Sequence, residues 1–290
     1  MTSATLLRGF ERRVEVIAGL RTRYWVGGDG PPLVLVHGLG GAAWNFTDLA
    51  PLLAARHRVL VPDLPGHGGT EPLPRLESLS DFAVHVAAVA EREDMSPAAV
   101  LGYSMGGSVA LRLGVERPEV VSSLVLVAAS GIVSTTRRAE IWLAAVSALR
   151  PARKVARFRY LLARRPNLRA PIFGYWGADE PRALSPEAVV GFLAAQPEHT
   201  DVEGAARALL EDDPRPDLGE VTCPVAVVWG ARDRLIPLED GFEYTRRLRC
   251  PLRVLPAAGH LLVGECPEEL AAVVEELLAT TLPSAVYIPV

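Results

Sequence analysis

Short apolar runs alternate with segments of helical periodicity along most of this chain. The runs that predict strands lie at residues 14–17, 23–26, 33–36, 59–61, 98–101, 124–127, 225–229 and 252–255. Apolar positions at helical spacing follow several of these runs, at about residues 44–55, from Ser80, after Gly107 and from Pro267. Apolar strands that alternate with helices are typical of a mostly parallel sheet covered on both faces. The pattern therefore predicts an α/β fold with a doubly wound sheet, opened by a hairpin or meander.

One long stretch departs from this alternation. Between Gly131 and about Thr222 no run favours a strand, and the helix-like segments are residues 141–149, 155–163, 186–195 and 202–210. Ser185, Pro186 and Glu187 together are a typical helix start. We therefore expect an α-helical cap, residues 131–221, over the C-terminal edge of the sheet. The core domain would then consist of residues 1–130 and 222–290.

Charge is segregated within this expected cap. Residues 137–169 are heavily basic, whereas residues 179–220 are rich in Asp and Glu. We expect the two faces to pair with each other and with solvent rather than to form a funnel for a charged substrate. Some of the cap's aromatic residues should line an apolar pocket, although each one taken alone is more simply core of the cap. They are Trp142, Phe158, Tyr160, Phe173, Tyr175, Trp176 and Phe192.

Composition limits the class of partner. The chain has 290 residues, of which 49% are apolar and 22% charged, and its formal net charge is −4. This is the composition of a soluble globular protein, and it gives no reason to expect nucleic acid or an anionic membrane as a partner. No apolar run reaches the length of a membrane span, about 18 residues. The first residues also lack the basic segment and apolar core of an export signal.

Cysteine usage and missing motifs argue against bound metals and cofactors. Cys223, Cys250 and Cys266 are odd in number, widely spaced and without a C-x-x-C pair. They predict neither a disulfide framework nor a zinc site, and they favour the reducing cytoplasm. There is no H-E-x-x-H motif, no P-loop and no G-x-G-x-x-G after the first strand. We therefore expect no metal and no organic cofactor.

The most informative motif is G-x-S-x-G at residues 102–106, which read GYSMG. An apolar run precedes it and an amphipathic stretch follows it, so the motif predicts a strand, a sharp turn and a helix. Ser104 would lie at the tip of the turn with its hydroxyl accessible. The helix would direct backbone N–H groups towards negative charge that develops nearby. An ordinary β-turn with an inert serine is the alternative interpretation.

A serine hydroxyl is a weak nucleophile until a base removes its proton and an acceptor orients that base. In a doubly wound sheet such groups meet at the C-terminal ends of strands. Asp233 follows the run at 225–229, and His260 follows the run at 252–255. The order Ser, Asp, His is the one expected for this turn motif. We therefore predict Ser104, Asp233 and His260 as a catalytic triad.

Other polar residues near strand ends have simpler roles. We expect His37 to fix its loop by hydrogen bonding and Asp63 to stabilise a turn between Pro and Gly neighbours. The remaining histidines, His57, His67, His85 and His199, are expected to be structural or surface residues.

Acyl transfer also needs N–H donors for the negative charge that forms on the substrate oxygen. One donor should be the backbone N–H of Met105, directly after the serine. The second should come from the loop at residues 37–41, which read HGLGG, and there we choose the N–H of Leu39, with that of Gly40 second.

Taken together, these motifs resemble the α/β-hydrolases that carry a helical cap, over roughly residues 14–282. The resemblance rests on HGLGG at 37–41, DLPGHG at 63–68, GYSMGG at 102–107, WGARD at 229–233 and GH at 259–260. It implies the serine branch of the family, because the dehalogenase and epoxide hydrolase branches need an aspartate at the nucleophile position. Leu261 stands where the C–C bond hydrolases typically have Trp. Ser108 stands where the menaquinone-pathway synthase usually has Arg.

The resemblance implies hydrolysis of small carboxylic esters by an acyl-enzyme mechanism, similar to carboxylesterases. C–C bond hydrolysis, lactone hydrolysis and lyase chemistry on the same triad are alternatives, as is a small-molecule receptor that retains the triad. The expected partner is a small ester or related acyl compound. We expect a monomer or homodimer in the cytoplasm.

Overall fold

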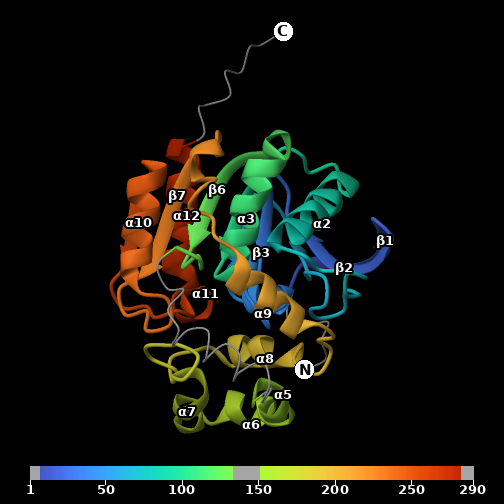
Figure 1. Ribbon diagram of the computed structural model, residues 1–290. Helices are drawn as coiled ribbons and strands as arrows, with labels where there is room; N and C mark the ends of the chain where they lie inside the picture. Colours follow the sequence, from blue (N-terminus) through green and yellow to red (C-terminus); the bar gives the residue numbers. More distant parts are fainter. Residues whose placement is uncertain (1–6, 133–150, 282–290) are drawn as a thin grey trace.

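The computed structural model describes residues 7–132 and 151–281. The predicted helix at 141–149, with Trp142, and the tail from residue 283 lie outside these residues. Figure 1 shows the chain with the central sheet above and the helices of the inserted region, residues 151–221, below.

A single sheet organises the described part of the chain. Its eight strands have the order β1-β2-β4-β3-β5-β6-β7-β8. β1 and β2 form an antiparallel hairpin and β2 pairs antiparallel with β4, whereas all later neighbours are parallel. The strands are β1 (Phe10–Ile17), β2 (Leu20–Gly27), β3 (Pro32–Val36), β4 (Arg58–Pro62), β5 (Ala98–Tyr103), β6 (Val121–Val127), β7 (Val225–Gly230) and β8 (Leu252–Leu255). The predicted α/β class, mostly parallel sheet and opening hairpin are confirmed.

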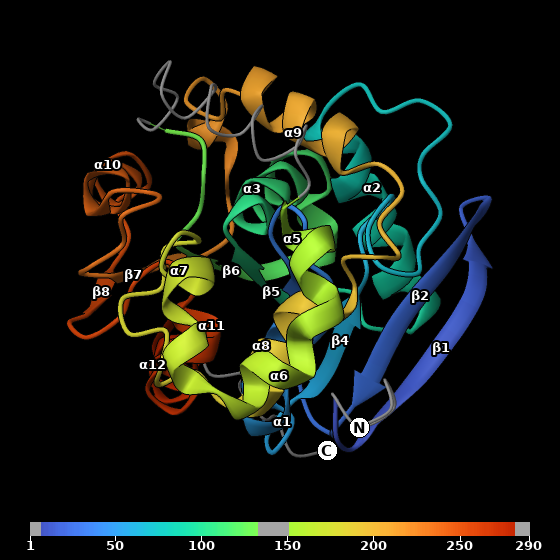
Figure 2. The same ribbon diagram turned by 90° about the horizontal axis from the view of Figure 1, so that it is seen from below.

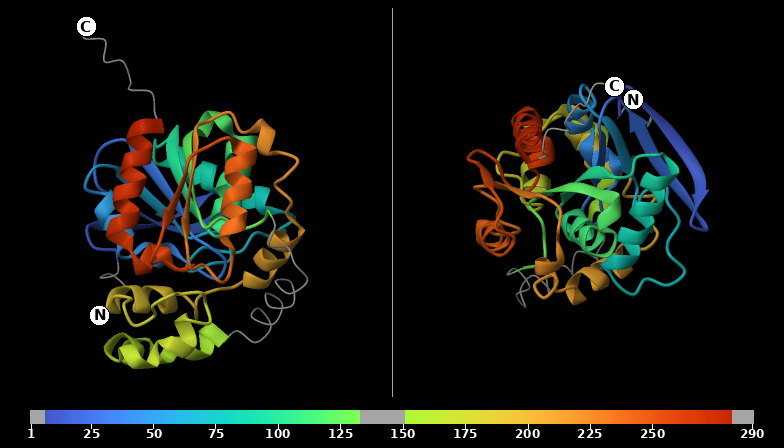
Figure 3. Two further views of the ribbon diagram at one scale, coloured as in Figure 1. Left: turned by 90° about the vertical axis from the view of Figure 1, so that its left-hand side faces the viewer. Right: turned by 90° about the horizontal axis from the view of Figure 1, so that it is seen from above.

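Helices on both faces explain why the central strands are apolar throughout. Every residue of β5 and of β7 is buried, as expected for a strand that is covered on two sides. The core helices are α1 (Leu49–Leu53), α2 (Leu79–Arg92), α3 (Met105–Glu116), α10 (Leu238–Leu248), α11 (Leu262–Glu265) and α12 (Pro267–Thr281). α2 packs against α3, and α1 packs against α12. Figure 3 shows α10 and α12 on opposite sides of the strands at their end of the sheet.

The described part of the segment between β6 and β7 consists of helices joined by turns and contains no strand. It contains α5 (Pro151–Val155), α6 (Arg159–Arg164), α7 (Ala170–Phe173), α8 (Pro186–Ala194) and α9 (Val202–Glu211). Viewed from below in Figure 2, α5, α6 and α8 lie across the edge of the sheet. Ser185 caps α8, since its Oγ accepts the N–H of Ala188 at 2.8 Å. The predicted helix start is therefore confirmed, whereas the domain boundaries at residues 131 and 222 stay a prediction.

Two predicted helices are interrupted. The helix expected at 44–55 divides into a 3₁₀ turn, Ala43–Phe46, and α1. Both the N–H and the hydroxyl of Thr47 donate to the carbonyl oxygen of Trp44, and these bonds close a tighter turn. The helix expected at 155–163 breaks at the 3₁₀ turn Ala156–Phe158, where Arg159 donates to the carbonyl oxygen of Ala156.

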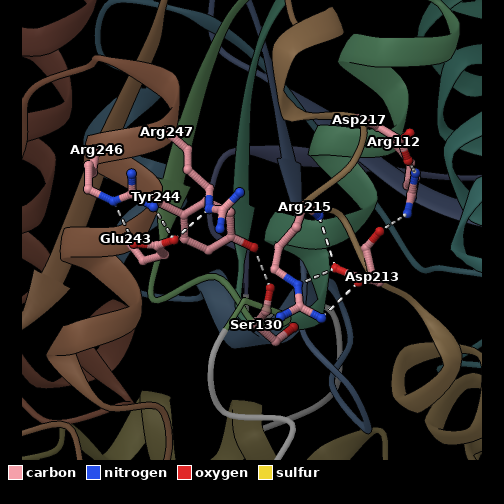
Figure 4. A network of polar contacts seen from close by, with 9 residues as sticks. All are labelled: Arg112, Ser130, Asp213, Arg215, Asp217, Glu243, Tyr244, Arg246 and Arg247. Carbon is pink, nitrogen blue, oxygen red and sulfur yellow. Dashed lines mark hydrogen bonds and ion pairs between the residues drawn. The ribbon is translucent and has the colours of Figure 1, made fainter.

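Several acids of the inserted region bind arginines of the core. In Figure 4, Arg112 of α3 lies against the chain that follows α9. Its Nε donates to Asp212 Oδ1 at 2.8 Å, and its Nη1 binds Asp217. Glu198 likewise binds Arg23 of β2, and Asp179 binds Arg232 after β7. These acids therefore bind arginines of the core. Part of the basic stretch 137–169 lies outside the described residues, so the expectation that the two faces pair with each other and with solvent stays a prediction.

Replacing His85 with Gln should make the fold less sensitive to acid. His85 of α2 is buried and contacts Thr22 Oγ1 at 3.1 Å, and burial lowers the pKa of the imidazole from 6.5 to about 4. Below pH 6.5 the unfolded chain binds a proton here that the folded protein does not bind. The free energy of unfolding therefore falls as the pH falls towards 4, by about 1.4 kcal/mol per pH unit for one such group.

Glutamine can donate to Thr22 but does not titrate, so the H85Q variant should lose stability less steeply over this range. Urea unfolding of both proteins across the range measures the two slopes, with neutral samples as the reference. Equal slopes would contradict the prediction.

Candidate active site

Ser104 lies on a strained turn between β5 and α3. Its φ is 56° and its ψ is −123°, a conformation that L-residues rarely adopt and that persists only when the surroundings enforce it. The N–H of Ser104 donates to the Val127 carbonyl at 3.0 Å, and its carbonyl accepts the N–H groups of Gly107 and Ser130. The backbone of the turn is therefore fixed on both sides, and the predicted strand–turn–helix is confirmed.

Glycines allow this turn to pack against the neighbouring strand. A Cβ atom at Gly106 would lie 2.1 Å from the carbonyl oxygen of Val36, and one at Gly102 would lie 2.3 Å from the carbonyl oxygen of Gly106. Both distances are far below any real carbon–oxygen contact. The G-x-S-x-G pattern is therefore a packing requirement of the turn.

The structure brings Ser104, His260 and Asp233 together. His260 Nε2 is 3.1 Å from Ser104 Oγ, and His260 Nδ1 is 2.8 Å from Asp233 Oδ2. The other carboxylate oxygen of Asp233 accepts the N–H groups of Leu235 and Ile236, each at 2.8 Å. The carboxylate therefore binds Nδ1–H, and this tautomer leaves the lone pair of Nε2 facing the serine hydroxyl.

Burial strengthens the pair of His260 and Asp233. Their side chains are only 4% and 0% exposed, so water does not compete for the hydrogen bond between them. The ring of Tyr103 lies against the imidazole, with the ring centroids 5.4 Å apart. Burial is the main cause that raises the pKa of Tyr103 well above its ordinary value, and the nearby carboxylates of Asp233 and Glu265 add to it. The phenol therefore stays neutral beside the imidazole.

The loop after β3 lies directly against Ser104. A Cβ atom at Gly38 would be 2.9 Å from the Cβ and 3.4 Å from the Oγ of Ser104. This contact puts Leu39 and Met105, the two predicted oxyanion donors, on segments that meet at the serine. Among the hydrogen bonds that the described residues make outside regular helices and strands, none uses the N–H of Leu39 or of Met105. The geometry is consistent with both groups being available to a ligand.

Three side chains hold the carbonyls of this loop. His37 Nδ1 donates to the carbonyl oxygen of Gly38 at 2.8 Å, while its Nε2 accepts the N–H of Leu64. His199 Nε2 and Gln196 Nε2, both between α8 and α9, donate to the carbonyl oxygen of Gly40 at 3.0 and 2.7 Å. Since these carbonyls are directed away by their partners, the intervening peptide of Leu39 has little freedom to rotate.

The two histidines at this loop are neutral. Burial lowers the pKa of His37 well below its ordinary value, and burial, with the nearby His67, lowers that of His199 to about 3. The role expected for His37 is confirmed. Sequence reasoning missed the part that His199 and Gln196 play, because each lies more than 150 residues from Gly40 and no local motif marks the contact.

Asp63 binds backbone and side-chain donors close to the same loop. It is fully buried, and its oxygens accept the N–H groups of Ala43 and Gly69 and the Nε of Arg23. The expected turn-stabilising role is therefore confirmed. The buried ion pair with Arg23 joins β2 to the turn after β4.

The His, Cys, Asp and Glu side chains of the described residues bear on two further kinds of site, a metal site and a thiol nucleophile. Within the ranges 7–132 and 151–281, no group of three His, Cys, Asp or Glu side chains is arranged to hold a metal ion. The cysteines are free, and burial raises the pKa of Cys250 to about 11 and of Cys266 to about 12. Their thiols are therefore protonated and poor nucleophiles at neutral pH. In the same ranges, no helix is both long and apolar enough to cross a membrane.

Comparison with known proteins assigns the family. Residues 33–273 match the alpha/beta hydrolase family, and the chain belongs to it. A pimeloyl-[acyl-carrier protein] methyl ester esterase of Aromatoleum aromaticum is 33% identical over 264 residues, which cover 86% of this chain and 98% of that protein. The crystal structure of E-2-(acetamidomethylene)succinate hydrolase superposes with a TM-score of 0.75 at 20% identity, covers 93% of this chain and 99% of that one, and shares the fold.

One relative is longer than this chain. The dihydrolipoyllysine-residue acetyltransferase component of the acetoin cleaving system of Pseudomonas putida is 30% identical over 280 residues. The match covers 89% of this chain and 66% of that protein, so the chain spans just under two thirds of the relative's length.

Replacing Gly38 with Ala should displace the serine while leaving the fold intact. The new methyl group would press on Ser104 and on the carbonyl oxygen of Tyr103, 3.3 Å away. Misplacement of a reacting group by about 1 Å costs on the order of a hundred-fold in rate. Labelling of Ser104 by a fluorophosphonate, followed by mass spectrometry, should therefore slow by about that factor.

Gly219→Ala is the matched control, because nothing lies within 4 Å of a Cβ atom there. Its labelling rate should equal that of the wild type. A Gly38→Ala variant that labels as fast as the wild type would show that the loop does not constrain the serine.

Proposed function

We propose that this protein is a serine hydrolase that cleaves small carboxylic esters through an acyl-enzyme. The observation that carries the proposal is the continuous hydrogen-bonded line from Ser104 Oγ through His260 to Asp233, with separations of 3.1 and 2.8 Å. The esterase named among the relatives supports the same class of substrate.

In the first half of the reaction, Ser104 Oγ attacks the carbonyl carbon of the ester. His260 Nε2 takes the hydroxyl proton as the new C–O bond forms. The carbonyl π electrons move to oxygen, and the N–H groups of Leu39 and Met105 bind that oxyanion. When the tetrahedral intermediate collapses, the bond to the alcohol breaks and His260 returns its proton to the departing oxygen.

In the second half, water attacks the acyl group on Ser104. His260 removes a proton from the water, the same two N–H groups bind the second oxyanion, and the acid leaves as Ser104 regains its proton. The imidazole is positively charged during both intermediates. Asp233 stabilises that charge because it is buried and already binds Nδ1–H.

The surroundings of the oxyanion loop suit this chemistry. Fixed dipoles stabilise developing charge best when they need not reorient during the reaction. His37 binds one carbonyl of the loop, and His199 and Gln196 bind another. The N–H of Leu39 is therefore directed by its neighbours before a substrate arrives.

The wider assignments follow from the same proposal. We propose that the inserted helices act as a cap that covers the substrate. We further propose a cytoplasmic protein without cofactor, since the free, half-buried cysteines suit a reducing compartment. Monomer and homodimer are both compatible with the arrangement of the site, which draws all its residues from one chain.

Replacing Ser104 with Ala should lower kcat by about 10⁴- to 10⁶-fold, because the acyl-enzyme can no longer form. The measurement is turnover of p-nitrophenyl esters, with fluorophosphonate labelling of the same samples. Ser80→Ala is the control, since Ser80 is a partly exposed serine at the start of α2, and it should keep both activities. An S104A variant with wild-type turnover would show that the nucleophile is misassigned.

A substrate panel should separate the ester hydrolase from the other chemistries of this site. Methyl esters and p-nitrophenyl esters of graded chain length should turn over many times per enzyme. Lactones, C–C cleavage substrates and a cyanohydrin report on the alternatives, the last by release of an aldehyde. A single slow event on every ester, with tight binding of the compound, would indicate a receptor and refute the proposal.

A further inference from the structure

The loop that carries His260 is fastened to the inserted region. The N–H of His260 donates to the carbonyl oxygen of Gly177 at 2.7 Å. Gly177 has a φ of 91°, and a Cβ atom there would lie 2.8 Å from the Cβ of His260. At Gly259 a Cβ atom would lie 2.2 Å from the same Gly177 carbonyl. The two backbones therefore touch directly, and glycines on both sides allow it.

One carboxylate bridges these two backbones. Glu265, at the end of α11, accepts the N–H of Asp179 at 2.6 Å and that of Glu180 at 3.3 Å through Oε1. Its Oε2 accepts the N–H of Gly259 at 3.1 Å. Glu265 therefore binds the inserted segment with one oxygen and the residue before His260 with the other. Arg232 adds a second link between the two backbones. Its guanidinium binds the side chain of Asp179, and its backbone N–H donates to the carbonyl oxygen of Ala258.

No neutral side chain of the same length satisfies these three donors. A carboxylate has two acceptor oxygens, whereas a carboxamide has one, and its NH₂ group would face a backbone N–H. Burial raises the pKa of Glu265, and the N–H groups of Asp179, Glu180 and Gly259 oppose that shift. Without the carboxylate, three backbone donors would lack acceptors at a half-buried contact, and the two backbones would separate to admit water.

We propose that Glu265 is a positioning residue that sets the place of His260 by holding the segment 177–180 against the histidine loop. This inference rests on the proposed role of Ser104, His260 and Asp233. Glu265 touches none of the reacting atoms. It acts through the backbone of Gly259 and through the Gly177 carbonyl that binds His260. The inserted region would then help to hold His260, the proposed base, in place.

The test compares Glu265→Gln with Asp81→Asn. Asp81 is a carboxylate that accepts two backbone N–H groups, those of Glu77 and Ser78, at the start of α2. The two substitutions remove the same charge and the same kind of bond, but only one lies beside His260. We expect E265Q to lower kcat by about ten- to a hundred-fold with an unchanged KM, and D81N to change neither. Glu265→Asp, which keeps both oxygens on a shorter arm, should recover part of the lost kcat.

A second readout needs no substrate. The proton between His260 Nδ1 and Asp233 should give a downfield ¹H resonance, assigned by its loss in Asp233→Asn. This resonance should shift or broaden in E265Q and stay unchanged in D81N. If E265Q does not fold, E265D must show the same change in smaller measure.

The outcomes are distinct. Wild-type kcat and an unchanged resonance in folded E265Q would overturn the inference, whatever its melting temperature. A wild-type protein that hydrolyses no ester would defeat the proposed function instead, and the resonance would still test Glu265.

Discussion

The close approach of the turn after β5 to the end of β3 is the constraint on which the site depends. Gly106 lies so near the carbonyl oxygen of Val36 that no side chain fits between them. Because of this contact, Ser104 adopts a φ of 56°. The same contact starts α3 beside the loop at 37–41, so Met105 and Leu39 lie on segments that both adjoin Ser104. Three backbone hydrogen bonds offset the strain in the turn. Ser104 donates to Val127 of β6, and its carbonyl oxygen accepts the N–H groups of Gly107 and Ser130.

The inserted region stabilises both loops that flank the serine. His199 and Gln196 hold the carbonyl oxygen of Gly40 on one side, and Gly177 holds the N–H of His260 on the other. The acids of the region pair with core arginines, as Glu198 does with Arg23 and Asp212 with Arg112. Such buried or half-buried links fix orientation more than they add net stability. The insertion is therefore joined to the core by directional polar contacts at the site itself.

Much of this architecture was predictable because local sequence patterns determine it. Continuous apolar runs predict buried parallel strands, and G-x-S-x-G predicts the turn at Ser104, since both reflect short-range sterics. Asp233 and His260 were predictable from their place after strands, because parallel strands end at one edge. α10 was missed although Leu238 and Leu248 pack against the core beside the buried Gly241 and Tyr244. The helix at 44–55 was drawn too long because the local bonds of Thr47 to the carbonyl oxygen of Trp44 close a 3₁₀ turn that the apolar spacing does not reveal.

The contacts that escaped prediction share one physical property. Gln196, His199 and Glu265 all bind backbone groups of residues distant in sequence. Nearly every residue carries the same backbone N–H and carbonyl, so the sequence does not mark which of them will be a partner. Their geometry depends on how the inserted helices lie on the sheet, which no local pattern specifies. Because the partner is a backbone dipole, such a residue can orient it without carrying a charge. His199, with its pKa lowered to about 3, acts as a fixed N–H dipole, and a charged imidazole there would lie buried beside His67 and Arg23. In the proposed reaction, the neutral side chains of His37, His199 and Gln196 would therefore orient the loop at 37–41 without adding a full charge of their own to it.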